Sequence, residues 1–250
     1  MEDSTKRFSN RVENYVKYRP HYPKEIITFL TNEIGLTPQN IIADIGSGTG
    51  ISSELFLQNG NKVYGIEPNK EMREAGEKYL EKYDKFLSVA GTAEDTLLES
   101  DSMDIIVCGQ AFHWFDTDKC KIEFTRIIKN NGYVVLIWNE RNTENSPLLT
   151  EYENLIKKFG TDYDKVSQKD EEVNEKIKIF FDERGYKTKH ISNYQLFDFE
   201  GFKGRLLSSS YVPSENEVMI VELKELFDKY QKDGNVKFEY DTNIFYGQLK

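Results

Sequence analysis

One short segment near the start of the chain limits the possible folds more than any other feature. The apolar run Ile41–Ile45 indicates a buried strand, and the turn Gly46-Ser47-Gly48-Thr49-Gly50 follows it at once. Glycine allows a tight turn and lets a ligand approach the backbone. The residues after the turn predict a helix with an apolar face, which carries Leu55, Phe56 and Leu57. A strand, a glycine turn and a helix in this order are typical of a nucleotide-type binding site.

The alternation of short apolar runs with amphipathic stretches continues along the chain. It predicts an α/β fold with a parallel, doubly wound sheet, because parallel strands are joined by helical crossovers. The expected strands span residues 41–45, 62–67, 86–90, 103–108, 132–138, 190–199 and 237–246. Helices are expected after Pro23, after the glycine turn, over 70–82 and 117–129, within the polar insertion 139–185 that contains Pro147, and twice within 201–232 on either side of Pro213.

The sequence is expected to form one domain over residues 1–250, since no repeat, low-complexity tract or flexible linker divides it. Residues 1–37 are expected to form an N-terminal helix and lid. Residues 38–140 form the expected cofactor-binding core. Residues 141–250 supply the helical insertion and the strands and helices on the acceptor side.

Residues on both sides of the glycine turn separate two classes of cofactor. The dinucleotide fingerprint needs glycine or alanine where this chain has Ile51. Asp44, two residues before the first glycine, would repel a pyrophosphate, whereas S-adenosylmethionine carries a sulfonium and an ammonium and no phosphate. Glu67 ends the second strand, where a carboxylate can accept hydrogen bonds from both ribose hydroxyls. The alternative is that both carboxylates only cap helices, and the pair together with the turn favours S-adenosylmethionine.

Four segments resemble the motifs of the class I methyltransferases, in the right order: 44–50, 65–72, 91–94 and 104–115. The resemblance covers residues 40–140 closely and implies a Rossmann-like, mostly parallel seven-stranded sheet with an antiparallel last strand. It also implies S-adenosylmethionine as the cofactor and S-adenosylhomocysteine as the product. No metal is expected, because the two cysteines lack the spacing of a zinc site. The resemblance assigns to the cofactor Asp44, Gly46, Ser47, Gly48, Gly50, Glu67, Pro68, Met72, Thr92, Ala93, Glu94, Gln110, Ala111 and Phe112.

The acceptor side resembles a narrower, small-molecule branch of this family, the type 11 branch that includes the trans-aconitate methyltransferases. The segment His113-Trp114-Phe115-Asp116 carries the resemblance, together with Tyr18-Arg19-Pro20 and residues 204–211 and 240–242. The fourth motif lacks the Asn/Asp-Pro-Pro-Tyr arrangement expected of enzymes that methylate amino groups of bases or glutamine. The resemblance therefore implies a small-molecule acceptor, with a carboxylic acid as the first expectation.

A carboxylate acceptor is already ionised at neutral pH, so it needs a cation to orient it and no general base. Arg19 and Arg205 are the candidates, and each has the alternative of being an ordinary structural arginine. His113 could act as the base for a hydroxyl or amine acceptor, or it could pack the loop after the fourth strand.

Several other residues near these positions have two interpretations each. Trp114 could form a pocket wall or only part of the core, and Asp116 is expected to cap the next helix, with Thr117 as the alternative. An aromatic lid over the sulfonium, or simple packing of an N-terminal helix, would involve Tyr15, Tyr18 and Tyr22.

Charge and cysteine content exclude several classes of protein. The net charge of −10 disfavours a nucleic-acid substrate, because such a surface repels phosphate backbones. No run approaches the roughly 20 apolar residues of a membrane span, and the first residues have no apolar segment typical of a signal peptide. Cys108 and Cys120 form no Cys-x-x-Cys pair, so a disulfide framework is not expected and the reducing cytoplasm is the expected compartment. A monomer is the default expectation for the oligomeric state.

Three functions remain open at this point. The first is transfer of a methyl group from S-adenosylmethionine to a carboxylic acid or to another small molecule through a hydroxyl, amine or carbon. The second is a cofactor-binding protein without turnover, which an intact glycine turn does not distinguish from an enzyme. The third, a nicotinamide dehydrogenase, is disfavoured by Asp44 and Ile51.

Overall fold

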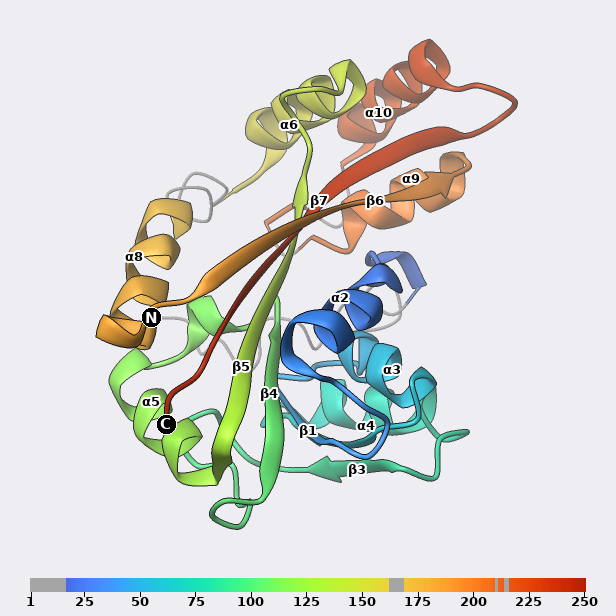
Figure 1. Cartoon of the computed structure of the whole chain (residues 1–250). Helices are drawn as coiled ribbons and strands as arrows, with labels where there is room; N and C mark the ends of the chain where they lie inside the picture. The colour runs from blue at the N-terminus through green and yellow to red at the C-terminus, as the bar shows by residue number, and fades with distance from the viewer. Residues whose placement is uncertain (1–16, 162–168, 210, 214–215) are drawn as a thin grey trace.

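A computed structural model describes residues 17–161, 169–209, 211–213 and 216–250. Their strands form one seven-stranded sheet in the order β3-β2-β1-β4-β5-β7-β6 (Figure 1). The strands are β1 (Ile41–Ile45), β2 (Lys62–Ile66), β3 (Phe86–Val89), β4 (Met103–Gly109), β5 (Ile128–Arg141), β6 (Lys187–Phe197) and β7 (Val236–Gly247).

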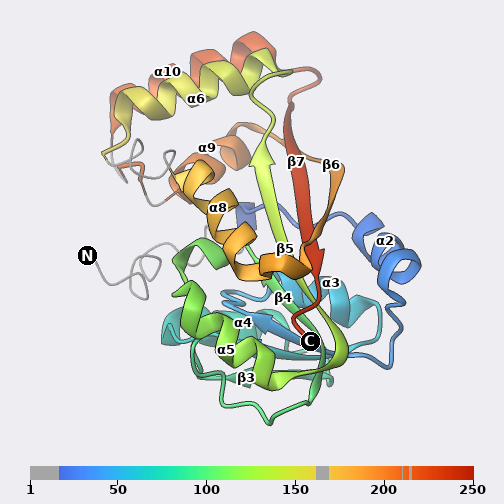
Figure 2. The ribbon, with the colours of Figure 1, turned by 60° about the vertical axis from the view of Figure 1, so that its left-hand side comes forward.

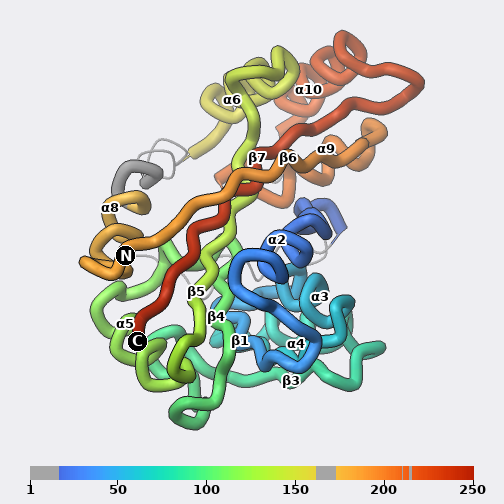
Figure 3. The backbone as a smooth tube through the Cα atoms, in the orientation of Figure 1, coloured from blue at the N-terminus to red at the C-terminus, as the bar shows by residue number. Residues whose placement is uncertain are grey.

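The first five strands are parallel, and β7 runs antiparallel to both of its neighbours. This confirms the predicted mostly parallel, seven-stranded sheet with an antiparallel last strand. β5 is longer than predicted at both ends, because its start pairs with β4 from Ile128 onward and its end continues to pair with β7 through Arg141. The three long strands β5, β7 and β6 run side by side from the lower part of the molecule to the upper helices (Figure 3).

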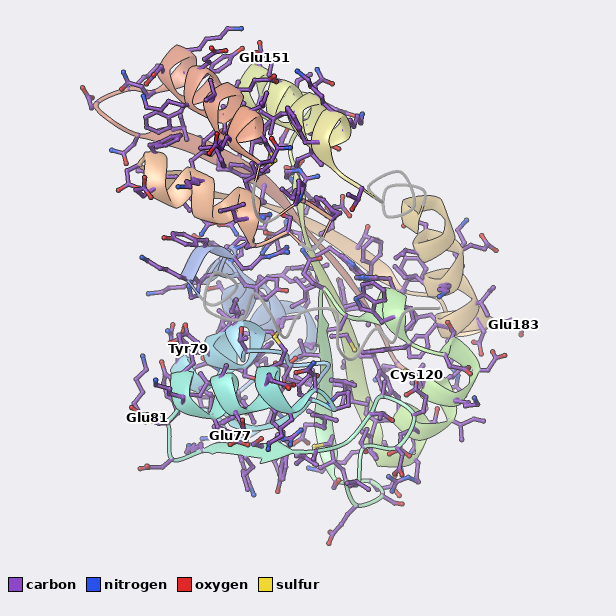
Figure 4. All side chains as sticks on the ribbon, turned by 180° about the vertical axis from the view of Figure 1, so that it is seen from behind. Glu77, Tyr79, Glu81, Cys120, Glu151 and Glu183 are labelled. Atoms are coloured by element: carbon purple, nitrogen blue, oxygen red, sulfur yellow. The ribbon has the colours of Figure 1, made fainter. Side chains whose placement is uncertain are left out.

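Two helical layers cover the sheet. One face carries α2 (Glu25–Ile34), α3 (Ile51–Gln58) and α4 (Lys70–Tyr79), whose apolar residues pack on alternate residues of the strands. The other face carries α5 (Thr117–Ile127) and α8 (Lys169–Phe181), which bury Cys120, Phe124 and Phe180 against the sheet. Tyr79 of α4 and Cys120 of α5 accordingly lie on opposite sides of the sheet in Figure 4.

Three further helices form a separate layer, called here the cap, over the far ends of β6 and β7 (Figure 2). The cap comprises α6 (Pro147–Phe159), α9 (Phe199–Leu207) and α10 (Glu217–Tyr230), and its core centres on Tyr152, Phe202 and Phe238. Glu151 joins two of these helices, because it accepts hydrogen bonds from Lys229 Nζ (2.7 Å) and Tyr230 Oη (2.7 Å) (Figure 4). Because α8 packs on the sheet and α6 on the cap, the predicted helical insertion after β5 is split between two layers.

Short polar residues set several helix starts, as the sequence predicts. Asp116 accepts a hydrogen bond from the backbone of Lys119, which confirms it as the N-cap of α5. Ser146 caps α6 just before the proline that occupies its first turn. No helix in the described ranges is both long enough and apolar enough to cross a membrane.

Candidate functional site

A cavity opens at the carboxyl ends of β1, β4 and β5. β1 and β4 are neighbours in the sheet although β2 and β3 lie between them in sequence, and ligands bind at such switch points of α/β sheets. The cavity therefore joins the glycine turn to the N-terminal segment and to the end of β5. Its lining consists of Arg19, Pro20, Tyr22, Gly46, Ser47, Gly48, Thr49, Ile51, Ser52, Gly109, Gln110 and Asn139.

The glycine turn has a backbone that other residues adopt only with strain. Gly46, Gly48 and Gly50 have φ values of 68°, 56° and 85°, all in the left-handed region. The amides of Gly46 and Ser47 both donate to the Ile66 carbonyl at the end of β2, which fixes the turn to the sheet. A Cβ at Gly46 would lie 2.7 Å from the Cβ of Ala111, so this position is closed to any side chain.

Asp44 lies beneath the turn and not in the cavity wall. It is fully buried, and its Oδ2 accepts hydrogen bonds from Ser52 Oγ (2.7 Å) and Ser53 Oγ (2.6 Å) at the start of α3. Burial raises the pKa of Asp44 to about 6, against the opposing effect of the two serine hydroxyls. Ser52 does line the cavity, so Asp44 acts on the site through its serine partner and its charge.

This buried carboxyl gives the first testable prediction. Between about pH 4 and pH 6 the folded chain keeps a proton on Asp44 that the unfolded chain has released, so Asp44 makes stability fall as pH rises through this range. Asp44→Asn removes this pH-dependent loss of stability, because asparagine does not titrate. The amide oxygen of the new side chain can still accept hydrogen bonds from both serine hydroxyls. We expect the variant to gain up to about 3 kcal/mol relative to the parent between pH 4 and pH 7, measured by urea unfolding. Parallel pH profiles for the two proteins would rule this out.

Glu67, just after β2, is a second buried carboxylate at the site. Its Oε2 accepts from the Gly48 amide (2.9 Å) and its Oε1 from the Asn69 amide (2.8 Å), while burial raises its pKa. Each carboxylate oxygen keeps capacity for a further hydrogen bond. Met72 is buried beside it, and its Cε lies 3.4 Å from the Cβ position of Gly48, whereas Pro68 is exposed.

The third predicted motif forms a turn at the rim of the sheet. Thr92 is exposed, and its Oγ1 accepts from the Asp95 amide (3.1 Å). Ala93 is buried, and Glu94 accepts from the Asp116 amide (3.1 Å). None of these residues lines the cavity.

The fourth predicted motif divides between cavity and core. Gln110 lines the cavity with φ of 57°, and its Nε2 donates to the Asn139 carbonyl at 3.0 Å. Ala111 and Phe112 are buried, and Phe112 packs edge-on against Phe180, which places it in the core. Among the predicted cofactor residues, the lining contains only Gly46, Ser47, Gly48 and Gln110.

The predicted acceptor residues are also separated. Arg19 lines the cavity and donates from Nη2 to the Ser208 carbonyl at 3.0 Å. Tyr18 packs its ring on α9, where a Cβ at Gly204 would lie 2.1 Å from it. His113 and Trp114 contact each other with tilted rings, whose centroids are 4.7 Å apart and whose planes differ by 46°, and both lie outside the cavity lining.

Arg205 is buried in the cap, only 3% exposed, and its Nε donates to Tyr240 Oη at 3.0 Å. It is outside the cavity lining, but Ser208, which contacts Arg19 through its carbonyl, also contacts Arg205 through its hydroxyl (3.4 Å). Of the expected lid tyrosines, Tyr22 lines the cavity and Tyr15 lies outside the described residues.

Three polar residues of the lining were not among the site residues predicted from the sequence. Thr49 belongs to the turn itself, Ser52 lies in the first turn of α3, and Asn139 follows the apolar run of β5. The carboxyl ends of neighbouring parallel strands meet at one edge of a sheet, so a polar residue at the end of β5 was a usable signal. No group of three or more His, Cys, Asp or Glu side chains that could hold a metal ion occurs within the part of the chain that the structure describes.

Comparison with known proteins shows which family the residues around this cavity resemble. Residues 43–136, which contain the glycine turn and the ends of β2 and β4, match the methyltransferase domain family. This stretch of the chain is therefore similar to a methyltransferase domain. An uncharacterized methyltransferase-like protein of Schizosaccharomyces pombe is 29% identical over 161 residues, which is 63% of this chain and 60% of that protein.

A second curated protein and a solved structure are similar to most of the chain. A candidate methyltransferase of Dictyostelium discoideum is 26% identical over 249 residues, 95% of this chain and 91% of that protein. A candidate type II methyltransferase of Anaeromyxobacter dehalogenans shares the fold, with a TM-score of 0.69 at 16% identity, over 93% of this chain and 98% of that one. The matches to the first curated relatives span only 53–60% of those proteins' length.

Proposed function

We propose that the chain transfers a methyl group from S-adenosylmethionine to a small-molecule carboxylic acid. The observation that carries the proposal is a cavity whose lining includes both the glycine turn and Arg19. The turn would hold the cofactor, and the arginine would face the acceptor. Alignment of the two reactants and exclusion of water are the main contributions an enzyme makes to such a transfer.

The residues around the turn suit S-adenosylmethionine. Thr49 Oγ1 is buried in the cavity wall without a hydrogen-bond partner among the described residues, so it can bind a polar group of a ligand. Glu67 offers carboxylate oxygens beside Gly48, and Asp44 lies beneath the turn. Their negative charges complement a cofactor that carries a sulfonium and an ammonium. When bound, the cofactor supplies a methyl group whose bonding electrons return to sulfur as the acceptor oxygen attacks.

Buried positive charge beside the cavity supports an anionic acceptor. Arg205 donates to the hydroxyls of Tyr240, Ser208 and Ser209, and within the described residues it forms no ion pair. A buried cation with only neutral partners is unfavourable, and an anion nearby stabilises it. Ser208 links this guanidinium to Arg19 at the cavity.

The same buried arginines lower the pKa of a neighbouring tyrosine, Tyr211. Arg141 is neutralised by Glu153 at 2.8 Å and also donates to Tyr211 Oη at 3.2 Å. Burial by itself raises the pKa of Tyr211, but the charges of Arg141, Arg205 and Arg19, with a hydrogen bond from Ser209, together outweigh burial and lower the pKa to about 8. A field that stabilises a phenolate also stabilises the carboxylate of a ligand. This acceptor needs no base, which fits the position of His113 outside the cavity lining.

Label transfer tests the proposal. The chain is incubated with methyl-labelled S-adenosylmethionine and a panel of mono-, di- and tricarboxylates, amines and phenols. We expect S-adenosylhomocysteine together with a labelled ester from at least one acid. Labelling of amines or phenols alone would refute the carboxylate acceptor, and S-adenosylmethionine binding without turnover on any acceptor would favour a binding protein.

Other properties of the chain belong to the same proposal. Both cysteines are buried free thiols, which fits the reducing, cytoplasmic compartment predicted from the sequence. The likeness to the trans-aconitate branch, the monomeric state and the absence of a nucleic-acid substrate stay predictions.

A further inference from the structure

Asn139 occupies a position in the cavity that neither the motifs nor the proposed function uses. It lies in β5 near the carboxyl end of the strand, lines the cavity with Gln110 and Arg19, and is 7% exposed. Its backbone is held on both sides, by the Gln110 side chain at its carbonyl and by pairing with Thr242 of β7. The side chain therefore has a defined origin at the wall of the site.

Hydrogen bonds define which end of the Asn139 amide is oxygen. Asn193 Nδ2 donates to the His21 carbonyl at 2.8 Å, and Asn193 Oδ1 accepts from the Tyr194 amide at 2.8 Å, so the orientation of Asn193 is set twice. The same Nδ2 also donates to Asn139 at 3.3 Å, which requires an oxygen there. Thr242 Oγ1 donates to that oxygen at 2.6 Å.

The other end of the amide is consequently a donor. Asn139 Nδ2 is buried and has no hydrogen-bond partner among the described residues. A buried donor without a partner costs free energy, so such groups in native proteins are explained by a ligand, a water or a functional role. Here the residue belongs to the lining of the cavity that also contains the glycine turn and Arg19.

We propose that Asn139 is a specificity-determining residue whose Nδ2 donates a hydrogen bond to a carboxylate oxygen of the acceptor. This inference rests on the proposed function and deepens it. Thr242 and Asn193 hold the amide oxygen, so the amide cannot rotate to present an acceptor to the cavity without losing both bonds. The site therefore selects acceptors with a hydrogen-bond-accepting oxygen and disfavours protonated amines.

A substitution that replaces the amide with a negatively charged carboxylate tests this role. Asn139→Asp keeps the size and the oxygen that Thr242 and Asn193 contact, but it replaces the donor with a carboxylate oxygen. Asn130→Asp is the matched control, because it makes the same change at an exposed residue near the other end of β5. Asn139→Ala is the second variant, which removes the donor without adding charge.

Calorimetry on the full chain saturated with S-adenosylhomocysteine supplies the readout, with succinate, citrate and benzoate as anionic probes and ethylamine as the cationic probe. We expect Asn139→Ala to weaken binding of the best anionic probe by about tenfold or more, as for loss of a hydrogen bond to a charged group, and Asn139→Asp to weaken it further, because its carboxylate also repels the probe. Asn130→Asp should leave this affinity unchanged. In turnover, KM for the acid should rise more than kcat falls.

Two results would overturn the role of Asn139: carboxylate binding to Asn139→Asp as tight as to the parent chain, or no carboxylate binding to the parent. Circular dichroism verifies that each variant is folded, and Asn139→Ala decides the question if Asn139→Asp is not. The dissociation constant of S-adenosylhomocysteine, measured in the same instrument, separates the two claims. If that ligand fails to bind the parent chain, the proposed function itself is wrong.

Discussion

The Gly46→Ala variant is expected to lose most of its affinity for S-adenosylmethionine and several kcal/mol of stability. Gly46 has a φ of 68°, and the left-handed region costs a residue with a Cβ about 1–2 kcal/mol. The new methyl group would also lie 2.7 Å from the Cβ of Ala111 and 3.1 Å from the Phe115 ring. Ala111 is buried, so the glycine turn has to move, and a shift of about 1 Å at a binding site costs on the order of 100-fold.

Gly35→Ala is the matched control for this variant. Gly35 has a nearly identical φ of 71°, at the C-terminal end of α2, and a Cβ there would meet nothing within 4 Å. It carries the backbone strain alone, so we expect a loss of about 1–2 kcal/mol of stability and no change in cofactor affinity. Thermal unfolding and calorimetric titration of both variants test the pair. Equal effects of the two substitutions on cofactor affinity would contradict the account.

The second large effect concerns the two buried arginines near the cap. Arg141 pairs with Glu153 at 2.8 Å, and both side chains are largely buried, at 16% and 14% exposure. Arg141→Met leaves Glu153 buried without its cation, which typically costs about 3–5 kcal/mol. Arg205→Met leaves no carboxylate unpaired within the described residues and removes a buried charge, so we expect less than about 1 kcal/mol of loss, or a gain.

Urea unfolding of the two methionine variants compares these costs directly. We expect the free energy of unfolding of Arg205→Met to exceed that of Arg141→Met by at least about 2 kcal/mol. If Arg205→Met is the more damaged protein, Arg205 is a structural residue and not a buried charge that favours an anionic ligand. Acceptor binding should be weakened in Arg205→Met despite its retained stability.

The order and type of the elements could be predicted from the sequence, because local patterns specify them. Alternating apolar runs located all seven strands, and the pattern Asp116-Thr117 located the start of α5. Boundaries were less predictable where tertiary pairing decides them. β5 was expected to end at residue 138, but pairing with β7 extends it to Arg141.

The site was predictable only near the glycine turn. A linear motif cannot distinguish a side chain in the wall of a cavity from one directly behind it. Asp44 and Phe112 belong to the expected motifs, yet Asp44 is covered by two serines and Phe112 packs on Phe180. Asn139 was missed for the converse reason, because its role depends on partners 54 and 103 residues away in sequence.

Binding of the cofactor tests the central claim most directly. The full chain is titrated calorimetrically with S-adenosylmethionine and S-adenosylhomocysteine, with NADH as the competing class. We expect one molecule of either adenosyl ligand per chain, a loss of binding in Gly46→Ala, and no binding of NADH. Binding of NADH, or unchanged adenosyl binding after Gly46→Ala displaces the glycine turn, would contradict this claim.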